Sequence, residues 1–221
     1  MSEGRATDHA LERLVFFSDA VFAIAITLLV IEIHPPHLPS SAPDTAHWRA
    51  LAGLIPSFVG YAISFGVIGL FWMGHHRSFA LAAHYHPHVL GWNLGLLATI
   101  AFMPFVTAYL SAHVGQRVPT LLYCLVLLLA ALLNLKVNAT ATSPPMVAED
   151  TTPEQRMAIR QRGLSVVLGA LTATALALVL PIIGQIGLIS IPLWRMLLAA
   201  RHRRRTALDP ASAPFSPGEG G

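Results

Sequence analysis

The chain has 221 residues, of which 54% are hydrophobic and only 11% are charged. So little charge cannot cover a water-exposed surface, which excludes the disordered, coiled-coil and cytosolic-enzyme classes and predicts an integral membrane protein. The net charge is only +3, and the single cysteine, Cys124, excludes an internal disulfide and a Cys-based metal site.

Apolar stretches predict six membrane-spanning helices. The first, residues 14–33, is long enough at ~1.5 Å per residue to cross a ~30 Å hydrocarbon core, and Pro35 and Pro36 end it. The second to sixth spans are expected at residues 51–73, 90–110, 120–135, 164–180 and 182–198. A polar loop at 138–162, with a short helix from Pro153, is expected between the fourth and fifth spans.

Basic residues in the short loops predict the orientation, because Lys and Arg gather on the cytoplasmic side. With the N-terminus inside, the outer side holds only Arg49 and Arg117. The inner side holds Arg5, Arg13, Arg77, Arg156, Arg160, Arg162, Arg201, Arg203, Arg204 and Arg205. We therefore expect an all-α membrane protein of six transmembrane helices with both termini cytoplasmic. Its parts are a cytoplasmic N-terminus (1–12), a six-helix transmembrane channel domain (13–200) and a basic, then disordered, cytoplasmic tail (201–221).

The sequence contains no nucleophile elbow, phosphate-binding loop or zinc-protease motif, and no paired carboxylates within a span. We therefore expect no enzyme activity, no cofactor and no nucleic-acid partner. The alternation of His84, His86 and His88 resembles a metal site, but Pro87 interrupts it and no carboxylate or thiol supports it. A solvated loop is the favoured interpretation, so no metal site is predicted.

Asp19 is the unusual residue of the first span. An ionised carboxylate at such depth costs about 3 kcal/mol on insertion scales unless it has partners. Either Asp19 is hydrated at the inner interface, or it joins a buried hydrogen-bond knot that fixes the first span against the second and third. The candidate members of that knot are Arg13, Ser18, Asp19, Trp72, His75 or His76, and Asn93.

Ile24, Thr27, Leu28 and Ile31 follow the i, i+3, i+4, i+7 spacing that aligns side chains on one helix face. In an apolar helix this spacing is more typical of packing or lipid contact than of a pore lining. The spacing by itself assigns no function.

A family resemblance adds to this picture. The segment Arg13-Leu14-Val15-Phe16-Phe17-Ser18-Asp19 resembles the R-x-x-x-F-S-D pattern that opens the first helix in the transmembrane protein 175 family of potassium channels. The segment from Phe71 to Arg77, Asn93 and the Pro104-Phe105 pair are similar too. The second half resembles the family only in hydropathy.

The resemblance implies a potassium-selective channel in the cell membrane, with one six-helix repeat per chain and a homotetramer whose pore is lined by the first helix. It implies a hydrophobic constriction at Ile24, further apolar rings at Leu28 and Ile31, and a selectivity layer at Thr27. The permeant potassium ion and membrane lipid are then the expected small partners.

Two rival functions remain open from the sequence. A proton-coupled or other secondary transporter should show interrupted helices in inverted repeats, and only the region of Pro181 and Pro192 looks interrupted. A proton-leak channel is the other alternative, and a structural subunit without conductance is a more distant third.

Overall fold

The chain is all-helical in its computed structural model, which describes the backbone of residues 2–207 and the side chains of residues 9–184 and 187–201. The predicted disordered tail lies almost wholly outside these residues. The described elements are α1 (Ser2–Ile31), α2 (Asp44–Gly53), α3 (Ile55–Phe79), α4 (His88–Ala112), α5 (Arg117–Ala141), α6 (Pro153–Val179), the 3₁₀ helix η1 (Pro181–Ile189) and α7 (Ser190–Ala207).

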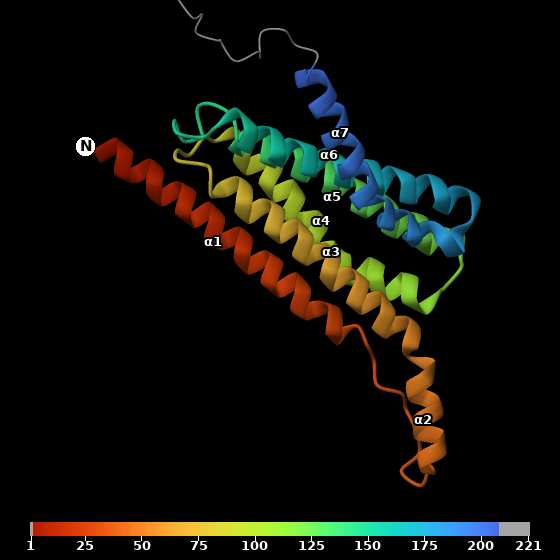
Figure 1. Cartoon of the computed structure of the whole chain (residues 1–221). Helices are drawn as coiled ribbons and strands as arrows, with labels where there is room; N and C mark the ends of the chain where they lie inside the picture. The colour runs from red at the N-terminus through yellow and green to blue at the C-terminus, as the bar shows by residue number, and fades with distance from the viewer. Residues whose placement is uncertain (1, 208–221) are drawn as a thin grey trace, which may run out of the picture.

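Six segments of the described chain are long and apolar enough to cross a membrane. They are α1 from His9, α3, α4, α5, α6, and η1 continued by α7 as far as Arg201. The protein is therefore a multi-pass membrane protein, as the sequence predicted. α2 is not one of these spans, and it projects away from the bundle (Figure 1).

Several helix boundaries differ from the prediction. The expected second span at 51–73 is split, because Pro56 lacks the N–H that would continue the helix from α2 and instead occupies the first turn of α3. α3 then continues through His75 to Phe79, which the sequence had assigned to a polar connection. Its helical hydrogen bonds persist to Ala80, whose N–H binds the His76 carbonyl at 2.9 Å.

The last three spans also differ in extent from the prediction. α5 runs six residues beyond the expected end. Hydroxyls bind carbonyls of its last turn: Thr142 donates to the Asn138 carbonyl and Ser143 to the Ala139 carbonyl, both at 2.7 Å. The helix expected from Pro153 is no separate piece but the start of α6, which is capped reciprocally by Thr152 and Gln155. The sixth span begins as the 3₁₀ helix η1.

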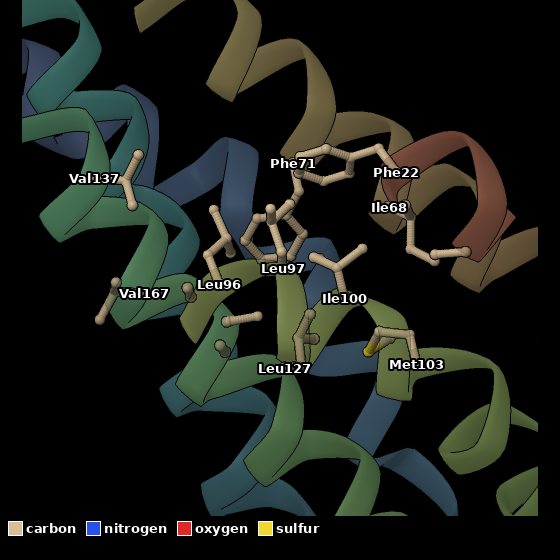
Figure 2. Close-up of a cluster of buried hydrophobic side chains, with 14 of the residues drawn as sticks. Phe22, Ile68, Phe71, Leu96, Leu97, Ile100, Met103, Leu127, Val137 and Val167 are labelled. Carbon is tan, nitrogen blue, oxygen red and sulfur yellow. The ribbon is translucent and has the colours of Figure 1, made fainter. Parts of the chain in front are cut away.

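The helices pack around α4. α1 lies against α3 and α4, α5 lies between α4 and α6, and α7 packs on α6. Large apolar side chains from five helices fill the interior, including Phe22, Ile68, Ile100, Leu127 and Val167 (Figure 2). α1 therefore lies at the edge of the bundle, with one side covered and one side free (Figure 1).

The α3–α4 and α5–α6 connections pair with each other at one end of the bundle. The N–H groups of Ala83 and His84 both donate to the Met146 carbonyl, at 2.8 and 3.1 Å, and the Ala148 N–H donates to the Leu81 carbonyl at 2.9 Å. Met146 is fully buried beneath them. These contacts hold the ends of α3 to α6 together where α1 presents Ser18 and Asp19.

Candidate functional site

α1 has one buried face. Leu14, Ser18, Phe22, Ala25 and Leu29 recur every three or four residues and are all buried. This face packs against α3 and α4. The spacing fixes which side of the helix the rest of the chain covers, and so which side it leaves open.

The opposite face of α1 has no cover within the chain. Ile24 is 57% exposed and Ile31 is 66% exposed, and Leu28 and Thr27 on the same side are also exposed. The four residues thus form a continuous apolar strip with a single hydroxyl. In a membrane such a strip contacts either lipid tails or another protein surface.

Thr27 is oriented by its own helix. Its hydroxyl donates to the Ile24 carbonyl at 2.9 Å. Because the hydrogen is used there, the lone pairs of Oγ1 remain available as acceptors on the exposed side. Thr27 therefore presents an oxygen with acceptor character one turn from the Ile24 side chain.

The buried face of α1 is joined to its neighbours by a chain of three hydrogen bonds. Ser18 donates to the Leu14 carbonyl at 2.7 Å, Asn93 Nδ2 donates to Ser18 Oγ at 2.8 Å, and Asn93 Oδ1 lies 2.9 Å from His75 Nε2. Ser18, Asn93 and His75 are completely buried. One chain of bonds thus links α1, α4 and α3.

The direction of these bonds follows from the one group that can only accept, the Leu14 carbonyl. Ser18 gives its hydrogen to that carbonyl, so it must accept from the Asn93 amide. The amide oxygen then faces His75, so Nε2 carries the proton that donates to it. His75 is held between Phe79 and Phe22, with ring centroids at 4.4 and 5.6 Å.

Asp19 forms a second, separate contact. Trp72 Nε1 donates to Asp19 Oδ1 at 2.8 Å. Asp19 is half-buried, and Trp72 is 39% exposed and stacks on His76. This bond joins α1 to α3 nearer the surface than the buried chain does.

The structure therefore brings together five of the six residues named for the knot, in two groups. Ser18, Asn93 and His75 form the buried chain, and Asp19 with Trp72 forms the outer pair. Arg13 is exposed and makes no hydrogen bond or ion pair with any other described side chain. Asp19 is only half-buried, so its open side is accessible to water while Oδ1 binds Trp72.

A second polar cluster was not anticipated from the sequence. The Thr107 and Ser64 hydroxyls lie 2.7 Å apart, and Ser64 lies 3.2 Å from the Tyr123 hydroxyl, with all three side chains buried. It ties α3, α4 and α5 together deeper in the bundle. Single hydroxyls within apolar spans were the only signal, and such residues are too common to mark a contact.

The histidine stretch makes only a small contact. His86 and His88 stack with their Nδ1 atoms 3.1 Å apart, and His84 is exposed. Among the described residues no three His, Cys, Asp or Glu side chains are grouped so that they could hold a metal ion.

Comparisons with known proteins point to a single family. The family model described as the endosomal/lysosomal potassium channel TMEM175 matches residues 13–104, a region that contains every residue of the α1 strip and of both anchoring contacts. A potassium channel of Streptomyces collinus is 36% identical over 54% of this chain and 59% of its own length. One from Chamaesiphon minutus is 36% identical over 62% of this chain and 69% of its own.

A more distant relative and a solved structure belong to the same family. The human endosomal/lysosomal proton channel TMEM175 is 29% identical over 59% of this chain and 28% of its own length. The crystal structure of a lysosomal potassium-selective channel TMEM175 homolog from Chamaesiphon minutus has a TM-score of 0.69 and 28% identity, and the match covers 87% of this chain and 98% of that one. The chain spans about three fifths of the Streptomyces relative.

Replacing Asn93 with Leu should destabilise the protein strongly. The change keeps the side-chain size but leaves the buried Ser18 and His75 without their partner, and each such loss costs about 1–3 kcal/mol. Trp72→Phe removes only the partly exposed bond to Asp19 and should cost less. Thermal unfolding in detergent measures both, and equal or greater loss in Trp72→Phe would contradict the dominance of the buried chain.

Proposed function

The chain belongs to the TMEM175 family of ion channels, and we propose that it acts as a potassium-selective channel whose pore is lined by α1. Potassium is the ion named for the two bacterial relatives and for the solved homolog. We place the protein in the cell membrane as a homotetramer with both termini in the cytoplasm. No bound cofactor is needed, since potassium itself is the transported substrate.

The observation that carries the proposal is the two-sided character of α1. One face is fixed to α3 and α4 by buried hydrogen bonds, and the other carries Ile24, Thr27, Leu28 and Ile31 without any cover from the same chain. Four copies related by a central axis would each bury this face against the others. A lipid-facing helix has no need for the Thr27 hydroxyl.

Ile24 is the proposed constriction. A ring of four isoleucine side chains is too apolar to hold water when narrow, and a hydrated cation crosses a dewetted constriction only at high cost. A modest tilt of the α1 helices, which keeps their buried hydrogen bonds, would widen the ring and admit water. Leu28 and Ile31 extend the apolar lining toward the outer side.

Thr27 is the proposed selectivity layer. Its Oγ1 has acceptor capacity to spare because its hydrogen binds the Ile24 carbonyl. Four such oxygens would replace part, but not all, of a potassium ion's hydration shell. We therefore expect a moderate preference for potassium over sodium rather than a strict one.

Proton conduction is the second candidate function, because the human and bovine relatives are named proton channels. A narrow apolar constriction that wets transiently would pass protons as well as potassium.

Secondary transport is the third candidate function. The interruption of the sixth span by η1 is the feature that favours it.

Flux measured in liposomes tests the proposed function. The purified full-length chain, reconstituted without any other protein, should carry potassium down its gradient faster than sodium and without a coupled ion. Proton flux exceeding potassium flux would instead support the proton channel. Potassium movement that requires a counter-moving ion would support a transporter.

Thr27→Val should lower the preference for potassium in the same assay. Valine has the size of threonine but offers no oxygen, so the ion loses ligands while the width of the pore stays similar. Thr174→Val on α6, whose hydroxyl binds its own helix at 2.8 Å, is the matched control and should change nothing. An unaltered potassium to sodium ratio in Thr27→Val would remove the selectivity role.

Ile24→Asn should raise the basal current. The amide wets the constriction, so ions no longer face a dry ring. Val30→Asn is the matched control, since Val30 is also exposed but lies about 120° around the helix from Ile24. Single-channel recordings measure both variants, and a larger current from Val30→Asn than from Ile24→Asn would refute the placement of the gate.

A further inference from the structure

A cavity of about 170 Å³ lies between α3, α5, α6 and α7, away from the exposed face of α1. Three arginines from three different helices line it: Arg77, Arg162 and Arg195. Arg77 and Arg195 lie close enough to Arg162 to repel its charge. In the described part of the chain none of the three forms an ion pair with a carboxylate.

The cavity is polar at one end and apolar at the other on every helix that lines it. Going deeper into the bundle, α3 presents Arg77, then Leu70 and Val67, and α6 presents Arg162, then Val166 and Ala170. On η1 and α7, as on α3 and opposite to α6, the arginine comes last in chain order: Arg195 of α7 follows Leu188 of η1 and Ile191 of α7. The three arginines thus gather at the end that the basic residues assign to the cytoplasm.

Two buried amides add hydrogen-bonding capacity at the same end. Asn134 and Asn138 lie one turn apart on α5 and line the cavity, and the Oδ1 atom of each is buried without a hydrogen-bond partner. Because the two amides are 4% and 3% exposed, each unpaired oxygen carries a desolvation cost that a ligand hydroxyl would remove. A site that holds both cationic donors and spare acceptors suits a group with a phosphate and hydroxyls.

We propose that this cavity binds an anionic phospholipid of the cytoplasmic leaflet, with its phosphate on Arg77, Arg162 and Arg195. Basic pockets between membrane helices on this side are suited to acidic lipid head groups. The headgroup hydroxyls bind the Asn134 and Asn138 amides. The first acyl carbons lie in the apolar part, and the rest of the lipid passes over the exposed Leu70 and Met73 at the rim.

The apolar half of the cavity separates a lipid from a soluble anion. Free phosphate would gain from the arginines but would leave the wall of Val67, Val166 and Leu188 uncovered. A phospholipid satisfies both halves at once, in the orientation that it already has in the membrane. The proposal is independent of ion conduction, because its test measures bound lipid and not flux.

The test is retention of phosphatidylglycerol by the purified full-length protein, measured by native mass spectrometry against phosphatidylcholine with the same acyl chains. The wild-type chain should retain phosphatidylglycerol preferentially, and Arg162→Gln should lower that retention about tenfold, because a hydrogen bond to a charged group is lost. Arg160→Gln is the matched control, since Arg160 is exposed on the same helix and does not line the cavity.

Three results would contradict the proposal. Equal retention by the wild type and Arg162→Gln, or equal retention of the two lipids by the wild type, would overturn it. Added inorganic phosphate should not displace phosphatidylglycerol, and displacement would assign the site to a soluble anion. If Arg162→Gln does not fold, the double variant Arg77→Gln/Arg195→Gln decides in its place, because both residues are exposed on the surface of the chain.

Discussion

The rotation of α1 about its own axis is set by the hydrogen bonds from Ser18 through Asn93 to His75. Because Ser18, Asn93 and His75 are completely buried, they have few other partners, so turning α1 would leave them unpaired. That constraint decides which side of α1 faces α3 and α4 and which side remains open. The exposed strip of Ile24, Thr27, Leu28 and Ile31 is a consequence of it.

α1 is held by two contacts that lie at different depths in the protein. The buried chain is fully desolvated and therefore strict in its geometry, whereas the Asp19–Trp72 bond lies where water has access. In the proposed channel, the end of α1 that carries these contacts is the fixed base from which the rest of the helix tilts. A small tilt then changes the width of the pore at Ile24.

The bundle on the far side of α4 is built differently. There α5, α6, η1 and α7 pack through small residues, and the buried Ala173 and Ala177 of α6 let η1 approach closely. The cavity lies between this half and α3, and the family model ends at residue 104, so it covers Arg77 but neither Arg162 nor Arg195. The proposed pore and the proposed lipid site therefore occupy different parts of the same subunit, joined through α3.

The sequence alone determined that the chain lies in a membrane and that it contains six spans. It also predicted a polar knot at similar depth, whose candidate members were Arg13, Ser18, Asp19, Trp72, His75 or His76, and Asn93. Hydropathy and the cost of an unpartnered polar group are properties of the residues themselves, so no coordinates were needed. The division of the knot into two groups came only from the tertiary structure. It depends on how each helix is rotated against its neighbours, and the sequence of a span that is apolar on all sides does not indicate that rotation. The meeting of Arg77, Arg162 and Arg195 has the same origin, because residues of three separate helices are brought together by packing alone.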